Sequence, residues 1–457
     1  MSRASAGIPN MRKSLEEKFT DIRIAAAGLL AAVLRFFYVY YTPAWRRQHD
    51  VIDFGAGEGQ AAFIEYIHDG HLLIDFDPRE RWGFFQPPLH HMLAAFWIHI
   101  QEFAGIAYGE ACEHVQLLTW VYSLVTLYFA YLIFKYFKLK GLPLMAAFML
   151  TAVHPGFILM SGSINNDMLA IMLVVMTMYF GLVWYDDPCW KYTVILAFTI
   201  GLGMMAKTSA SLIAPAIALV FIVRFIQGGT EGFVPYMKKF VVFGFICFPL
   251  ALWSPVRNYI LFGVPLNFTP EVGERITASL AARIFDIRCR IPYVSRITNG
   301  DPYDEFNMLL GMMKTSLFGD ENFAYVMAEA GHSGFGALFM TAAGWILLLS
   351  GTVLAISALY TTVRVLVSGK YIASPVIRLY LGAVYTVTLI MYVSFMIKAP
   401  YYSSMDFRYI LYLIPLEALM LGMYIEKSGN LFRRMVWIMT GIFAVTTTAL
   451  YVMLSRA

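Results

Sequence analysis

Charged residues are scarce in this chain of 457 residues, where Asp, Glu, Lys and Arg together occupy only 14% of the positions. Soluble domains carry roughly a quarter charged residues, so the composition excludes an ordinary soluble protein. Hydrophobic residues instead make up 59% of the chain and aromatic residues 16%. The composition therefore predicts a polytopic integral membrane protein that is surrounded by the lipid bilayer.

Several signatures of common function classes are also missing. The sequence has no Walker loop, no dinucleotide-binding fingerprint and no His-Glu-x-x-His segment, so no motif indicates nucleotide hydrolysis or zinc proteolysis. The net charge of +4 is small and the basic residues are scattered, so no nucleic-acid partner is indicated. Four cysteines lie far apart and lack metal-ligand spacing, although a Cys112–Cys289 disulfide could form if both residues lie outside the membrane.

Apolar segments recur along the chain, and a spanning helix needs about 20 mostly apolar residues. The first twenty residues lack the apolar core and cleavage site of a removable signal peptide, so we expect the first segment to remain in the mature protein. No internal repeat is visible. By length the sequence predicts an all-α protein with about eleven spans, at 24–41, 113–134, 142–160, 168–185, 192–206, 209–227, 240–260, 337–360, 379–397, 409–426 and 435–454.

The segment 87–103 decides the orientation of every later loop, because it is long enough to span but carries several polar residues. If it spans, the basic run 135–140 falls outside, whereas a surface-lying segment places that run inside, as the positive-inside rule favours. The N-terminus is then cytoplasmic. Two long polar loops, 42–112 and 261–336, lie on the outer side of one membrane domain (1–457), and 306–318 is the likeliest helix of the second loop.

The first outer loop is unusually rich in ionisable residues for a simple connection. Asp50 follows His49 close to the outer end of the first span, where a carboxylate is partly desolvated yet reachable from the aqueous side. That position suits a general base. An acid that ends a helix and pairs with Arg46 or Arg47 explains the same residues equally well.

Three cations lie at the outer ends of spans. Lys207 sits in a short turn of small residues, where its ammonium could meet a phosphate in a cavity or extend to the lipid head groups. Arg408 stands beside Asp406 and could hold a phosphate through two oxygens. Arg257, at the end of the seventh span, lies on the same side.

The triplet Asn165-Asn166-Asp167 precedes the fourth span. An Asx residue before an apolar run is the ordinary signal for the start of a helix, and this reading is favoured for the triplet alone. A second acid at the outer face could instead hold a metal or position a sugar hydroxyl.

Short motifs occur in a fixed order along the chain. They are Arg47-Gln48-His49-Asp50-Val51, Gly59 to Tyr66, Phe85-Gln86-Pro87-Pro88-Leu89-His90-His91, Asn166-Asp167-Met168-Leu169-Ala170, Ala206-Lys207-Thr208, Arg257-Asn258-Tyr259 with Phe262-Gly263-Val264-Pro265, and Lys314-Thr315-Ser316-Leu317-Phe318-Gly319. In this order, and together with the topology, they resemble membrane glycosyltransferases of the GT-C fold. The resemblance is to the family 39-like branch, which contains protein O-mannosyltransferases and lipid A aminoarabinose transferase, and it covers nearly the whole chain.

The resemblance implies surface-lying helices at 59–68 and 87–103, and an inverting transfer of a sugar from undecaprenyl or dolichyl phosphate to a hydroxyl outside the membrane. It assigns the base to Asp50, with His49 beside it. The leaving phosphate is assigned to Lys207, Arg408 and Arg257, and substrate positioning to Asp167, Asn166, Gln86, His90 and Glu65. The leaving group is already a phosphate ester, so no cofactor is required, although Asp50 and Asp167 could bind a divalent metal.

Two other functions fit parts of the pattern. A flippase or transporter of lipid-linked sugars would also bind phosphate in a membrane cavity, but transporters tend to show internal repeats and midplane sites. A non-catalytic scaffold fits the acid-rich outer loop less well. The sugar and the acceptor stay open among protein hydroxyls, lipid A, teichoic acid and cell-wall glycan, and the compact size favours a bacterial plasma membrane.

Overall fold

The computed structural model describes residues 7–44, 53–266, 268, 270–271, 275–294, 305–319 and 334–455. Within these residues the chain folds into helices, and an isolated antiparallel bridge joins Arg275 to Tyr401. The all-α fold class is therefore confirmed.

Eight helices in the described part of the chain are long and apolar enough to cross a membrane. They are α1 (Gly7–Tyr41), α5 (Val115–Tyr136) continued from α4 (Tyr108–Glu113), α8 (Asp167–Asp186), α10 (Ala214–Gln227) continued from η1 (Thr208–Ile213), α11 (Gly229–Phe262), α15 (Phe335–Val367), α16 (Pro375–Lys398) and α18 (Asn430–Ser455). The protein is thus an integral, multi-pass membrane protein.

Two further apolar helix pairs are bent, and each has the form of either a broken span or a re-entrant loop. The pair α6 (Gly141–Ala152) and α7 (Pro155–Ser161) bends by 44°, and η2 (Tyr402–Met405) with η3 (Phe407–Ile410) meets α17 (Leu413–Lys427) at 57°. The remaining predicted span, 192–206, corresponds to α9 (Trp190–Ala206). Its 17 residues rise about 25 Å, slightly less than the thickness of the hydrocarbon core of a bilayer. Each of the eleven predicted segments thus falls on a helix or a bent pair.

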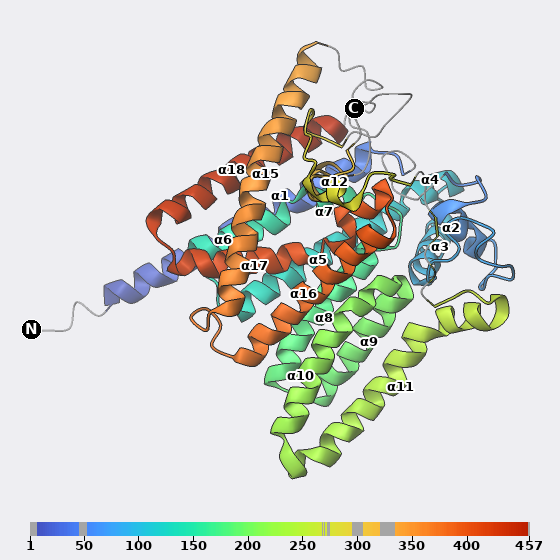
Figure 1. Ribbon diagram of the computed structural model, residues 1–457, viewed down its shortest axis with the longest axis horizontal. Coiled ribbons are helices and arrows are strands. Elements are labelled where there is room, and N and C mark those ends of the chain that lie inside the picture. The colour runs from blue at the N-terminus through green and yellow to red at the C-terminus, as the bar shows by residue number, and fades with distance from the viewer. Residues whose placement is uncertain are drawn as a thin grey trace, which may run out of the picture.

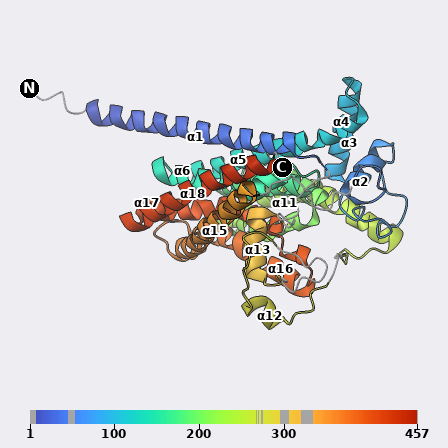
Figure 2. The same cartoon turned by 90° about the horizontal axis from the view of Figure 1, so that it is seen from above.

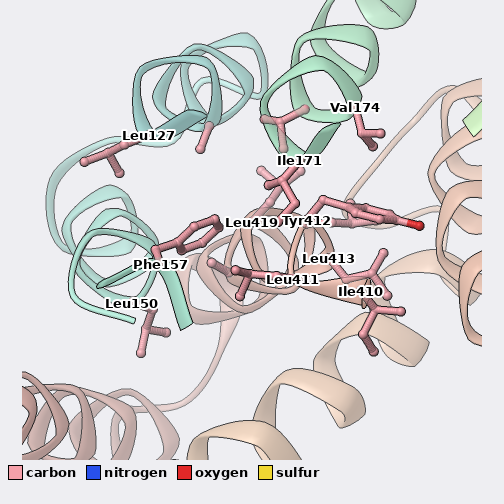
Figure 3. Close-up of a cluster of buried hydrophobic side chains, with 14 of the residues drawn as sticks. Leu127, Leu150, Phe157, Ile171, Val174, Ile410, Leu411, Tyr412, Leu413 and Leu419 are labelled. Atoms are coloured by element: carbon pink, nitrogen blue, oxygen red, sulfur yellow. The ribbon is translucent and has the colours of Figure 1, made fainter. Parts of the chain in front are cut away.

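Part of the main core lies around η3 and the start of α17, where Figure 3 shows side chains of α5, α6, α7 and α8 gathered against residues 410–419. Leu419 is fully buried there. Close approach of α17 to α6 depends on Gly422, because a Cβ at this position would lie 3.1 Å from the Pro143 carbonyl oxygen. Small residues at helix contacts serve this purpose in membranes, where burial from water supplies little attraction between helices.

The described part of the loop 42–112, the predicted first outer loop, forms a second, smaller core at one end of the bundle. It contains α2 (Gly59–His68) and α3 (Leu89–Phe103), which pack on each other, and its buried side chains include Phe63, Phe84 and Ile98. With α4 they lie at the end of the molecule opposite the N-terminus (Figures 1 and 2). The two helices expected in this loop are therefore present, and neither is among the candidate spans.

The second outer loop is described in part. It contains α12 (Leu280–Phe285) and α13 (Met308–Phe318), the latter where a helix was predicted. Thr315 on α13 holds the start of η3, because its Oγ1 donates to the Met405 carbonyl at 3.1 Å and accepts from the Phe407 N–H at 3.0 Å. Cys112 is buried, Cys289 is exposed and both thiols are free, so the Cys112–Cys289 disulfide is not formed.

Candidate active site

A cavity of about 520 Å³ opens where η1, the end of α11, α16, η2, η3 and the first outer loop meet. Its volume lies within the range of small-molecule binding sites. The lining combines two cations, Lys207 and Arg408, with several hydroxyl groups and an apolar wall. That wall includes Trp82 and Phe85, whose ring centroids are 5.3 Å apart, and Phe268, which is 5.9 Å from Phe85.

The two cations of the cavity share one carboxylate. Lys207 forms an ion pair with Oδ1 of Asp167, and Nε of Arg408 lies 3.6 Å from Oδ2 of the same residue. A second acid, Asp406, has its Oδ2 at 3.2 Å from Nε of Arg408. Asp167 and Arg408 are almost fully buried, and buried charges persist in proteins when they are paired in this way. The chain thus brings together three residues that the sequence singled out separately.

Local turns set the positions of these charges. Oδ1 of Asn165 accepts the Asp167 N–H at 3.0 Å at the start of α8, and Oδ1 of Asp406 accepts the Arg408 N–H at 2.9 Å at the start of η3. Lys207 follows the last residue of α9 in extended conformation, which turns its side chain out of the helix. The ring of Tyr409 lies beneath both cations, 5.0 Å from Nζ of Lys207 and 5.2 Å from Cζ of Arg408.

Asn166 supports the wall of the cavity through hydrogen bonds, but its own side chain does not line the cavity. Its Nδ2 donates to the Ala206 carbonyl at 2.7 Å and to Oε1 of Gln86 at 3.2 Å. Gln86 does line the cavity. Asn166 therefore joins the first outer loop to the end of α9, beside Lys207.

His90 lies behind the same wall. It is fully buried, and its Nε2 donates to the Ile164 carbonyl at 2.7 Å, which supports the turn that leads to Asp167. Burial lowers the pKa of His90 to about 4, so the ring is neutral near pH 7. His90 is placed to support the site through this turn, since it does not line the cavity.

Glu65 organises the loop that carries the predicted base. Its Oε2 accepts the Gly55 N–H at 3.0 Å and its Oε1 accepts the Tyr108 hydroxyl at 3.2 Å. Gly55 has a φ of 85°, in the left-handed region that glycine adopts without strain. Glu65 therefore fixes the chain shortly after Asp50 and lies outside the lining of the cavity.

Arg257 fastens the first loop to α11. Its Nη2 donates to the Ile74 carbonyl at 2.5 Å, while its neighbour Asn258 lines the cavity. Arg79 makes a parallel connection from the loop side, with Nη2 at 2.9 Å from the Phe262 carbonyl. The two arginines hold residues 74–79 against the end of α11, so Arg257 has a structural contact besides its predicted role in phosphate binding.

Asp50 and His49 lie outside the described residues. Of the predicted metal pair, Asp167 alone is therefore described. Both of its carboxylate oxygens face cations, which occupy the positions where a divalent metal would bind.

Sequence reasoning missed the hydroxyl groups and aromatic rings of the cavity. Ser209 and Ser211 follow Lys207, and Ser403 and Ser404 precede Arg408. The clustering of serine beside each outer cation was a visible signal for these polar positions. The apolar wall gave no such signal, because aromatic residues are common throughout the chain.

The chain was compared with known proteins. No curated protein matches the sequence. Residues 86–253 match the family described as dolichyl-phosphate-mannose-protein mannosyltransferase, a range that includes Asp167 and Lys207 but ends before Arg408.

Solved structures resemble this chain over nearly its whole length. The archaeal oligosaccharyltransferase AglB from Archaeoglobus fulgidus, in complex with an inhibitory peptide and a dolichol-phosphate, is 12% identical with a TM-score of 0.52, over 96% of this chain and 56% of that one. The same organism's oligosaccharyltransferase tethered to an acceptor peptide is 13% identical with a TM-score of 0.51, over 95% and 55%. ArnT from Cupriavidus metallidurans bound to undecaprenyl phosphate is 12% identical with a TM-score of 0.47, over 94% and 76%.

The chain spans about half the length of the oligosaccharyltransferase chains that it matches. At such low identity the likeness concerns the fold. Taken together, the helical architecture and these structural matches show that the chain has the GT-C glycosyltransferase fold, and residues 86–253 are similar to the dolichyl-phosphate-mannose-protein mannosyltransferase family.

Proposed function

We propose that this protein is an inverting glycosyltransferase that moves a sugar from a polyprenyl phosphate, such as undecaprenyl or dolichyl phosphate, to an acceptor hydroxyl at the outer face of the membrane. The observation that carries the proposal is the placement of Lys207 and Arg408 on the wall of one cavity beside Asp167. An AglB structure that shares the fold holds a dolichol-phosphate, which supports a lipid phosphate as the donor.

The charges of the site fit the chemistry of such a donor. A sugar linked to polyprenyl phosphate is a phosphodiester with one negative charge, whereas the released polyprenyl phosphate is a monoester that carries more negative charge. Lys207 and Arg408 therefore meet a charge that grows as the bond to the sugar breaks. Fixed cations aimed at developing charge stabilise the transition state more than the ground state, which accelerates the reaction.

The proposed step balances as follows. The acceptor hydroxyl oxygen bonds to the anomeric carbon, and the bond from that carbon to the phosphate oxygen breaks with its electron pair staying on the phosphate. The hydroxyl proton passes to Asp50. Asp167 and Asp406 keep the two cations in place, since each carboxylate lies beside one or both of them.

Asp50 and the neighbouring His49 fall in the segment between α1 and α2, and both described flanks of this segment are tied to neighbouring elements. The Ala44 N–H donates to Oε2 of Glu113 at 2.7 Å on one side, and the Gly55 N–H donates to Glu65 on the other. These anchors support the proposal that the base is carried close to the outer end of the bundle.

The apolar part of the cavity suits a lipid donor. Leu212, Met391 and Phe395 line it and belong to η1 and α16, which are parts of candidate spans. A polyprenyl chain can therefore lie along these helices while its phosphate reaches the cations. The proposed orientation places the cavity outside a bacterial plasma membrane and the N-terminus inside, with Gln86 positioning the substrates and with no cofactor required.

The test is release of free polyprenyl phosphate by the purified protein from a panel of polyprenyl-phosphate sugars, with candidate acceptors supplied. We expect wild type to release the lipid from one sugar and Asp50→Ala to lose that activity while still binding the donor. Equal turnover by both proteins would reject the base. Movement of lipid-linked sugar across a vesicle bilayer, without release from any donor, would identify a flippase instead.

A further inference from the structure

Three metal-ligating side chains meet at the far ends of α2 and α3, outside the cavity. They are His68, the last residue of α2, with His99 and Glu102 on the last turns of α3, and their ligand atoms all lie within 4.8 Å of one another. Nε2 of His68 is 2.8 Å from Oε2 of Glu102, and Nδ1 of His99 is 3.6 Å from the same oxygen. Two imidazoles and one carboxylate form a ligand set that zinc prefers.

The two distances from Oε2 of Glu102, 2.8 Å and 3.6 Å, lie on either side of the separation between two ligand atoms of one zinc ion. Zinc bonds to nitrogen and oxygen of about 2.1 Å place neighbouring tetrahedral ligands about 3.4 Å apart. The rings of His68 and His99 stack with centroids 4.2 Å apart, so one ring must turn its nitrogen toward the ion. His99 can do so, because more than half of its side chain is exposed.

A neighbouring carboxylate orients His68. The other ring nitrogen of His68, Nδ1, lies 3.3 Å from Oδ1 of Asp69. Histidine ligands commonly donate their second N–H to a carboxylate in this way, which fixes the tautomer and strengthens the bond to the metal. The arrangement gives His68 an Nε2 lone pair directed at the cluster.

We propose that His68, His99 and Glu102 bind one divalent transition-metal ion of the zinc type, with water completing the coordination, and that this ion joins α2 to α3. The site is separate from the cavity and does not depend on the proposed transfer reaction. It stabilises the pair of helices that carry Glu65, one turn before His68 on α2, and His90, at the opposite end of α3; these residues support the first loop and the turn before Asp167.

The experiment uses the full-length protein without an affinity tag, treated with a chelator and then titrated with zinc against a chromophoric competitor. We expect one zinc ion per chain, no comparable binding of magnesium, and a rise in the melting temperature on zinc addition. His99→Ala and Glu102→Gln should weaken zinc binding at least tenfold, and Asp69→Asn should weaken it about 10- to 100-fold. Transfer activity is not part of the readout.

His71→Ala is the matched control, because His71 is an exposed histidine of the same loop that stacks on Tyr66 with a centroid distance of 4.4 Å. It should bind zinc as wild type does. The proposal is overturned if wild type binds no zinc, or if His99→Ala and Glu102→Gln bind zinc as tightly as His71→Ala. A melting temperature of zinc-free His99→Ala equal to that of zinc-free wild type will show that the variant is folded.

Discussion

Lys207 and Asp167 form an ion pair that joins the end of α9 to the first residue of α8. The same carboxylate faces Arg408, which comes from the other half of the chain. One acid thereby orients two cations, so in the proposed reaction the donor phosphate would meet both already in position. Such preorganisation would remove the need to rearrange charges during that reaction.

Replacement of Lys207 tests the phosphate site. We expect Lys207→Met to lower the rate of polyprenyl phosphate release about 10²- to 10³-fold, the usual cost of removing one stabilising group at developing charge. Direct binding of polyprenyl phosphate should weaken as well. Lys191→Met, at the exposed opposite end of α9, is the control, and a Lys207→Met protein that behaves like it would exclude Lys207 from the site.

Replacement of Asp50 tests the base. Asp50→Asn keeps the size of the side chain but removes its basicity, so transfer should fall about 10²- to 10⁴-fold. Donor affinity should stay the same, because the phosphate is held by other residues. Asp53→Asn changes an exposed acid three positions away and should retain full activity; equal losses in the two variants would mean that only the charge of the loop matters.

The role of Arg257 in attaching the first loop to α11 can be tested by mutation. If its main contact is the Ile74 carbonyl, Arg257→Ala should raise the KM for donor only a few-fold, and Arg79→Ala should do the same. Both variants should also be cleaved faster in the loop around residues 69–82 during limited proteolysis. A loss in Arg257→Ala as large as in Lys207→Met, without faster cleavage, would instead place Arg257 on the phosphate.

His90 makes stability dependent on pH. Because the pKa of His90 is about 4 in the folded protein and 6.5 in the reference state, the unfolded chain takes up a proton first as the pH falls. The contribution of neutral His90 to the free energy of unfolding is complete above pH 6.5 and is lost as the pH falls toward 4. The total loss is about 3 kcal/mol.

The variant His90→Gln keeps a donor for the Ile164 carbonyl but cannot titrate. Its melting temperature should therefore fall less than that of wild type between pH 7 and pH 5. His71→Gln removes an exposed histidine and should follow wild type, and a His90→Gln protein with the wild-type slope would show that His90 does not control the acid response.

The spans could be predicted from the sequence because apolar length is a local property. The start of α8 shows which contacts a local sequence pattern cannot predict. A cap by the Asx triplet was expected, but the residue at the N-cap position, Asn166, makes no capping hydrogen bond. Asn165 accepts the Asp167 N–H just before the helix, and Asn166 reaches Gln86 and the end of α9. These partners lie 80 and 40 residues away, so no local pattern could reveal them.

The meeting of Asp167 with both cations was unpredictable for the same reason. Lys207 and Arg408 were each recognised as polar residues at the outer end of a span. Their common partner depends on how α8, α9 and η3 pack. For Asp167 the sequence indicated a helix cap, a metal ligand or a residue that positions a sugar hydroxyl. The structure adds to that role a buried, cation-facing carboxylate.

The spacing of the three charges also bears on biogenesis. Asp167 and Lys207 are close in sequence, so they can pair as soon as α8 and α9 have been made, and a neutralised pair costs less at a membrane than a bare ammonium. Arg408 emerges about 200 residues later, which takes about 10 to 40 seconds of synthesis. For the proposed phosphate site this means that a chain ending before Arg408 holds only one of the two cations, already paired with Asp167.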